Sequence, residues 1–346
     1  MRLIGYGALG ATMLAGAVVA QQRERLPDEC RREIMALCDR GSGIRDCVRA
    51  ALPKLSDNCR KAISDRAGSA APPPTGTREL AYGADPKQKM DLVVPANATR
   101  APLLLFVHGG GWSIGDKRSG AGLKAAHFTA QGWAFASANY RLVPGATVEQ
   151  QAADIAAAIA FARAHAAENG LDPDHIVLMG HSSGAHVAAL VGTDPRYLAA
   201  AGVPMSAVKG VVLLDGAGYD IARQMARPGN PVAGMYDAAF GPDIARQNAL
   251  SPTLHAAAPN VASWLILPIQ RRADSTEQSQ ALAAALRHAG ASATVVAITG
   301  ESHASLNQGL GEEGDVATGE VDRFLARSAN PPDCNDPRRA RLVRRG

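Results

Sequence analysis

A serine flanked by glycines stands at residues 180–184 of this 346-residue chain, in the sequence Gly-His-Ser-Ser-Gly. The short apolar run at residues 176–179 before it predicts a buried strand, and the residues after it predict a helix. A glycine two positions away on either side lets the chain turn sharply there, which lifts the central side chain above the sheet. At such a turn Ser182 is the predicted nucleophile of an acyl-transfer reaction, and the helix start favours developing negative charge.

Three consecutive glycines follow another predicted strand, at residues 103–107, in the sequence His-Gly-Gly-Gly-Trp of residues 108–112. Acyl transfer passes through a tetrahedral oxyanion, which backbone N–H groups stabilise when they are held in place beforehand. We therefore predict that the amides of Gly110, Gly111 and Ser183 form an oxyanion hole. The run lacks the lysine and the spacing of a phosphate-binding glycine loop, so nucleotide binding is not expected.

A serine nucleophile needs a base and an acid that orients the base, and both should follow later strands. His303 comes after the last predicted strand and is the predicted base. We place the acid at Asp274, which follows the predicted strand at residues 264–267 and immediately precedes a helix. Helix capping is the alternative role for this residue. Asp215 and Asp220, which follow the preceding strand, are the rival positions for the acid.

The elements that must position these residues alternate along the chain. Predicted strands are residues 80–82, 90–94, 103–107, 134–138, 176–179, 211–214, 264–267 and 294–298, and predicted helices are residues 120–131, 148–165, 183–191, 277–288 and 316–326. The first two strands are expected to form a hairpin, and the others are short apolar runs suited to buried parallel strands. The alternation predicts an α/β fold, a doubly wound and mostly parallel sheet with helices on both faces.

Several of these motifs occur together in one enzyme family. They are His-Gly-Gly-Gly-Trp at 108–112, Asn-Tyr-Arg-Leu at 139–142, Gly-His-Ser-Ser-Gly-Ala-His at 180–186, Arg-Ala-Asp-Ser at 272–275 and the closing His303. On them, residues 78–327 resemble the hormone-sensitive-lipase-like and the feruloyl-esterase and kynurenine-formamidase-like branch of the α/β-hydrolases. The resemblance implies hydrolysis of small carboxylic esters through an acyl-enzyme, without metal or cofactor. Before His303, Glu301 and Ser302 replace the family's frequent Gly-Ala-Gly pattern, so the resemblance leaves the acyl specificity open.

Residues 219–259 lie between two predicted core strands and are expected to cover the acyl pocket. We predict Trp112, Tyr219 and Met235 as pocket residues, although any one apolar residue there could equally belong to the core. Two other functions stay open, an arylformamidase-like amide hydrolase and a non-catalytic binding protein on a hydrolase scaffold. Intact nucleophile, base, acid and oxyanion glycines favour the enzyme, because only catalysis requires all four.

The first twenty residues are typical of an export signal. Arg2 precedes an uncharged, Gly/Ala-rich apolar stretch at residues 3–20, and the small side chains of Val18 and Ala20 suit cleavage before Gln21. An uncleaved membrane anchor is the alternative, but the stretch is at the short edge of a membrane span. We therefore expect an exported protein, periplasmic or secreted, without stable membrane insertion after cleavage.

Four of the five cysteines, Cys30, Cys38, Cys47 and Cys59, cluster within thirty residues, and residues 68–330 contain none. An even cluster behind a signal peptide predicts two disulfides in an oxidising compartment, with three pairings open. Zinc is not expected, since the cluster has no histidine and no Cys-x-x-Cys pair. The run resembles one cysteine-rich repeat of Golgi apparatus protein 1 and its bacterial relatives. We expect a small helical module whose stability does not depend on the hydrolase domain.

The predicted organisation is a signal peptide at 1–20, the cysteine-rich module at 21–68, a proline-rich linker at 69–77, the hydrolase domain at 78–328 and a basic disordered tail at 329–346. A net charge of +4 and 47% hydrophobic residues describe a globular protein and do not favour nucleic-acid binding. We expect a small-molecule ester as the partner. Cys334 in the tail is expected to stay unpaired or to link two chains, and the sequence does not fix the oligomeric state.

Overall fold

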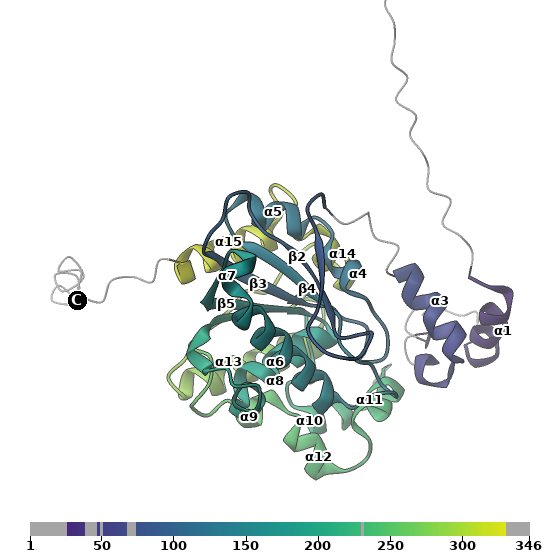
Figure 1. The fold of residues 1–346 in the computed structure, drawn as a ribbon. Helices are drawn as coiled ribbons and strands as arrows, with labels where there is room; N and C mark the ends of the chain where they lie inside the picture. The colour runs from purple at the N-terminus through teal and green to yellow at the C-terminus, as the bar shows by residue number, and fades with distance from the viewer. Residues whose placement is uncertain (1–25, 39–46, 49–50, 68–73, 230–231, 330–346) are drawn as a thin grey trace, which may run out of the picture.

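One eight-stranded sheet with helices on both faces forms the centre of the computed structural model, which describes residues 26–38, 47–48, 51–67, 74–229 and 232–329 (Figure 1). The strands are β1 (Arg78–Ala81), β2 (Lys89–Val93), β3 (Ala101–Val107), β4 (Ala134–Ala138), β5 (Leu171–His181), β6 (Val208–Leu214), β7 (Ser263–Leu267) and β8 (Ser292–Val295). Their order in the sheet is β1-β2-β4-β3-β5-β6-β7-β8. β2 pairs antiparallel with β1 and β4, and the other neighbours are parallel. The predicted mostly parallel α/β fold is confirmed.

The helices of this domain divide between the two faces of the sheet. They are α4 (Lys117–Ala121), α5 (Lys124–Ala130), α6 (Val148–Ala164), α7 (Ala166–Asn169), α8 (Ser183–Thr193), α9 (Pro195–Ala200), α10 (Ile221–Met225), α11 (Ala233–Phe240), α12 (Ile244–Ala249), α13 (Ala273–His288), α14 (His303–Gly309) and α15 (Val316–Ala329). α6, α8 and α13 pack on one face, and α5 and α15 pack on the other (Figure 1).

Each face of the sheet has its own apolar core, because successive residues of a strand point to opposite faces. In β3, Leu103 and Leu105 belong to the core under α6, α8 and α13, whereas Leu104 and Phe106 belong to the core under α5 and α15. The central strands are therefore buried on both sides, as the continuous apolar runs of the sequence predict. This rigid double layer carries the loops at the carboxyl ends of the strands.

Two disulfides hold the N-terminal module together. They join Cys30 to Cys59 and Cys38 to Cys47. The prediction of two disulfides within this cluster is confirmed, and the structure selects one of the three pairings that the sequence leaves open. The elements around them are α1 (Asp28–Leu37), the 3-10 helix η1 (Leu52–Lys54) and α3 (Asp57–Ala67).

The module also contacts the main domain. Ile114, in the loop after β3, packs against the small apolar core of the module, and η1 packs against α11. In Figure 1 the module lies to the right of the sheet, next to α11. These contacts link the two parts of the chain, and the independent stability of the module stays a prediction.

Several sequence predictions lie outside the described residues: the signal peptide at 1–20, most of the linker, Cys334 and nearly all of the basic tail. Within the part of the chain that the structure describes, no helix has the length and apolar character needed to cross a membrane. The same described ranges contain no group of three or more His, Cys, Asp or Glu side chains arranged to hold a metal ion.

Candidate active site

Ser182 lies at the turn between β5 and α8, where its backbone adopts φ 57° and ψ −123°. A positive φ is strained for a residue with a side chain, so the surrounding structure must hold it. The Ser182 N–H donates to the Leu214 carbonyl over 3.0 Å, which anchors the turn to β6. Steric crowding requires a glycine at position 184, because a Cβ at Gly184 would collide with the carbonyl oxygens of Val107 and His108. This is the strand–turn–helix arrangement that the sequence predicts.

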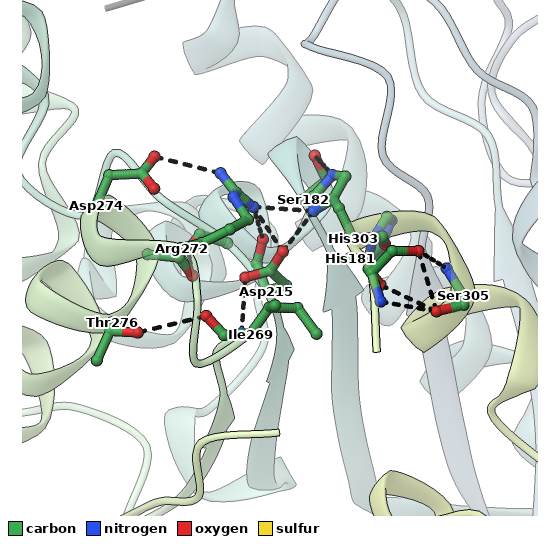
Figure 2. Close-up of polar contacts among 12 residues, drawn as sticks. His181, Ser182, Asp215, Ile269, Arg272, Asp274, Thr276, His303 and Ser305 are labelled. Atoms are coloured by element: carbon green, nitrogen blue, oxygen red, sulfur yellow. Dashed lines mark hydrogen bonds and ion pairs between the residues drawn. The ribbon is translucent and has the colours of Figure 1, made fainter. Parts of the chain in front are cut away.

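His303 begins α14, and its ring lies between Ser182 and a carboxylate (Figure 2). Its Nε2 is 2.9 Å from Ser182 Oγ, and its Nδ1 is 2.6 Å from Asp215 Oδ2. Ser302 caps α14, since its side chain accepts the Ser305 N–H over 3.0 Å, and this fixes the start of the helix that carries the ring. The structure therefore brings the predicted nucleophile and the predicted base together.

The carboxylate beside His303 belongs to Asp215 and not to Asp274, so the geometry disagrees with the sequence prediction of the acid. Asp215 directly follows β6, its side chain is 0% exposed, and its Oδ1 accepts the Ile269 N–H over 3.0 Å. Asp274 lies in the first turn of α13 and reaches Arg272 at 3.2 Å. The other rival, Asp220, caps α10 instead.

Asp215 is ionised in this setting. Burial raises the pKa of its carboxyl, but the hydrogen bond from His303 and the positive charge of Arg272 lower it more strongly. The net result is a pKa well below the ordinary range of aspartate. A buried carboxylate that stays charged can orient the imidazole and stabilise positive charge on it.

His181, the residue before the nucleophile, supports the backbone of His303. Its Nε2–H donates to the His303 main-chain carbonyl over 2.9 Å, and the two ring centres are 4.6 Å apart. Burial, and then the charge of His303, lower the pKa of His181 well below its usual value. His181 is therefore neutral and holds His303 without adding charge beside it. The sequence does not predict this supporting contact of His181. The only signal for it is the position of His181 directly before the nucleophile in the turn motif.

The glycine loop passes directly beside the nucleophile. A Cβ at Gly109 would lie 2.9 Å from Ser182 Cβ, which leaves no room for a side chain there. Gly110 and Gly111 have φ values of 135° and 60°, which glycine adopts readily. Ser183 is the first residue of α8, where helical amides lack intrahelical partners. The three residues predicted to form the oxyanion hole thus stand on the two segments that flank Ser182.

The predicted pocket residues are placed differently from one another. Met235 of α11 lies over the glycine loop, since a Cβ at Gly111 would collide with its sulfur. Trp112 is 1% exposed and packs edge-on against two aromatic residues of α11, and Tyr219 is 0% exposed. Because neither ring has free surface, Trp112 and Tyr219 belong to the apolar core, and the structure does not place them on an open pocket wall. Met235 keeps its place as a candidate substrate contact.

Solved structures show the same architecture over most of this chain. An esterase B from Lactobacillus Rhamnosis aligns with a TM-score of 0.66 at 22% identity, covering 82% of this chain and 96% of that one. The apo form of esterase 2 from Thermogutta terrifontis aligns with a TM-score of 0.59 at 23% identity, covering 74% and 96%. The chain has an α/β-hydrolase fold.

Sequence comparison refines this assignment. Residues 90–202 of the hydrolase domain match the BD-FAE family model. Over 113 residues the chain is 39% identical to a probable isoprenylcysteine alpha-carbonyl methylesterase of Arabidopsis thaliana, covering 32% of this chain and 24% of that protein. Over 100 residues it is 39% identical to the probable carboxylic ester hydrolase LipM of Mycobacterium tuberculosis, covering 28% and 23%. Residues 90–202 are therefore similar to ester hydrolases of the hormone-sensitive-lipase and feruloyl-esterase type, and the matched segment spans about a quarter of these relatives' length.

Proposed function

We propose that this α/β-hydrolase is a serine hydrolase that cleaves small carboxylic esters through an acyl-enzyme, with Ser182, His303 and Asp215 as its catalytic triad. The observation that carries the proposal is the continuous line of contacts at the turn between β5 and α8. His303 bridges Ser182 Oγ at 2.9 Å and Asp215 Oδ2 at 2.6 Å. The names of the similar proteins, a methylesterase and a carboxylic ester hydrolase, support ester cleavage, although the matched segment covers only part of each.

In the first half-reaction, Ser182 Oγ attacks the ester carbonyl carbon while His303 Nε2 takes the hydroxyl proton. For this the neutral imidazole must carry its proton on Nδ1, which donates to Asp215 and leaves Nε2 free to accept. The Asp215 carboxylate then stabilises the imidazolium. His303 gives the proton to the leaving alcohol oxygen as the ester C–O bond breaks, and the acyl group stays on Ser182.

In the second half-reaction, water takes the place of the alcohol. His303 Nε2 accepts a proton from the water as its oxygen attacks the acyl carbonyl, and returns a proton to Ser182 Oγ as the acid leaves. In both halves the negative charge develops on the former carbonyl oxygen. We assign its stabilisation to the amides of Gly110, Gly111 and Ser183, each such donor being worth roughly 10²–10³ in kcat in other hydrolases.

A fluorophosphonate probe and an ester assay test this proposal together. The intact chain should be labelled on Ser182 and should hydrolyse p-nitrophenyl acetate, whereas Ser182→Ala should lose the label and on the order of 10⁴ or more in kcat. Ser206→Ala, at an exposed serine far along the chain from the turn, is the matched control and should behave as wild type. Labelling at another residue, or activity of Ser182→Ala near the wild-type rate, would contradict the proposal. An aryl formamide as competing substrate tests the preference for esters over formamides.

We also infer that the chain works in an oxidising compartment. The two disulfides of the N-terminal module are the observation behind this inference, because such bonds persist in secreted and periplasmic proteins and are rare in the cytosol. Export by the predicted signal peptide would place the chain there. Mass spectrometry of the exported, non-reduced protein tests both points, since it should find both bonds and an N-terminus at Gln21.

A further inference from the structure

Arg272 lies between two carboxylates beside the proposed triad (Figure 2). Its Nη1 donates to Asp215 Oδ2 over 2.6 Å and to the Asp215 main-chain carbonyl over 3.2 Å. Its Nη2 donates to Asp274 Oδ2 over 3.2 Å. The residue precedes α13, and its side chain is 30% exposed, so the guanidinium is mostly withdrawn from water. The carboxylate that orients His303 is therefore itself held by an arginine.

The same guanidinium touches the catalytic ring. Nη1 of Arg272 lies 2.9 Å from Nδ1 of His303. When Nδ1 carries the proton that it donates to Asp215, both nitrogens are donors, so they share Asp215 Oδ2 as acceptor and cannot bond to each other. Arginine stays protonated at any working pH. A permanent positive charge thus stands in contact with the ring that must become positively charged during the reaction.

On the basis of the proposed triad, we propose that Arg272 is a positioning residue. It fixes the Asp215 carboxylate, and it keeps His303 neutral down to a lower pH than if Asp215 were the only charged group beside the ring. A buried carboxylate 2.6 Å from the imidazole favours its protonation before substrate arrives. Protonated His303 cannot accept the Ser182 proton, so a lone Asp215 would hold part of the enzyme in an inactive form. The charge of Arg272 opposes this protonation.

Asp274 has an indirect part in this arrangement. Its contact with Nη2 directs the guanidinium so that Nη1 faces Asp215, and its negative charge moderates the effect of Arg272 on the ring. Asp274, the acid predicted from the sequence, therefore acts on His303 through Arg272. In Figure 2, the dashed contacts run from Asp274 through Arg272 to Asp215 and on to His303.

The other groups facing His303 do not supply this charge. His181, from the end of β5, is neutral and bonds the main-chain carbonyl of His303. Glu301, just before α14, is bonded to the hydroxyl of Ser305. Lys124, at the start of α5, acts electrostatically on His181. Asp215 and Arg272 both contact the ring at Nδ1.

The test is the pH dependence of kcat/KM for p-nitrophenyl acetate, measured on the full chain and on Arg272→Met and Arg272→Lys. In Arg272→Met the acid limb should move to higher pH by about one unit, which lowers the rate about tenfold at a pH below the limb. The plateau of kcat/KM at higher pH should also be lower in Arg272→Met, because Asp215 is held less firmly. Arg272→Lys keeps the charge without the planar fork and should return the limb toward wild type while the plateau stays low.

An acid limb at the wild-type pH in Arg272→Met, whatever happens to the plateau, would reduce Arg272 to a structural residue and overturn the proposal. Arg272→Gln is a second neutral variant, and the rate of fluorophosphonate labelling against pH is a second readout that needs little activity. If both neutral variants fail to fold while Arg272→Lys folds, the charge serves stability first, which also counts against the proposal. A wild-type chain that neither hydrolyses esters nor takes the label would instead refute the proposed function.

Discussion

Replacing Asp215 by asparagine should cost about 10³–10⁴ in kcat, and two effects produce this loss. The Asp215 side chain is 0% exposed and meets His303 at 2.6 Å. Because both charges are delocalised beyond the contacting atoms, we take a separation of roughly 4 Å between their centres. At an effective dielectric constant of about 20, that separation corresponds to about 4 kcal/mol of stabilisation of the imidazolium. A barrier raised by about 4 kcal/mol slows the reaction about 10³-fold.

The second effect of Asp215→Asn is on the tautomer of His303. Asparagine can turn its amide N–H₂ toward Nδ1, which then becomes an acceptor and moves the ring proton to Nε2. An imidazole protonated on Nε2 cannot accept the Ser182 proton, and loss of the tautomer accounts for about 10⁴ in a related triad. The two effects overlap because both act through the His303 ring, so their contributions do not add. We therefore expect about 10⁴ as the upper end of the loss in kcat.

The assay for Asp215→Asn is steady-state hydrolysis of p-nitrophenyl acetate, with thermal unfolding to verify the fold. Asp274→Asn is the matched control: it makes the same change of atoms at a carboxylate that contacts Arg272 at 3.2 Å and not His303. We expect Asp274→Asn to stay within about tenfold of wild type, a change of at most about 1.4 kcal/mol. If Asp274→Asn lost more kcat than Asp215→Asn, with both proteins folded, the acid would be Asp274 and the reasoning from geometry would be refuted.

Three further outcomes follow from the packing around the site. Gly184→Ala should destabilise the fold by about 3 kcal/mol or more in chemical denaturation, because its Cβ meets backbone oxygens. Gly202→Ala, at φ 70° with open space around it, is the control and should cost only about 1–2 kcal/mol, so equal losses would contradict this. Burial lowers the pKa of Lys124 to about 7 in the folded protein. Between about pH 7 and pH 10 the unfolded chain therefore binds more protons than the folded chain, so the free energy of unfolding should rise with pH across that window. Lys124→Met should flatten that rise, and an unchanged slope would show that Lys124 is not its cause. Reduction should speed hydrogen exchange in residues 26–38 and 51–67 while ester hydrolysis largely persists, and a collapse of activity would show that the module supports the site directly.

Where a constraint is local, the sequence predicts the structure closely. The turn at Ser182 needs glycines because backbone oxygens crowd it, and that requirement is visible within five residues. Strand cores are equally visible, since residues 134–138 are both the predicted strand and β4. Strand ends are harder to predict from the sequence. β8 ends at Val295, although the apolar run continues to residue 298. Ile298 still bridges to Ile269, so the pairing continues beyond the last regular strand residue.

Contacts between distant segments are harder to predict from the sequence. The pairing of the four cysteines depends on how α1 and α3 pack, and nothing in their spacing distinguishes the three possibilities. The contact of Ile114 with the module is of the same kind, because it joins a loop of the hydrolase domain to a core more than fifty residues earlier. Full burial of Trp112 likewise depends on α11, which packs two aromatic rings against it. An apolar residue type alone does not separate core from pocket, for Trp112 or for Tyr219.

The acid shows most clearly what decides between two plausible residues. Leu214 pairs with His181 in the sheet, so the next residues, Asp215 and Ser182, leave the ends of adjacent strands at the same level. Asp274 follows the end of β7 by seven residues and has already entered a helix. Strand register therefore brings Asp215 to His303, and register is set by pairings between segments, which a local pattern of apolar residues does not reveal. Once Asp215 holds that place, Arg272 fits between the two carboxylates and binds both, so Asp274 reaches the histidine only through the arginine.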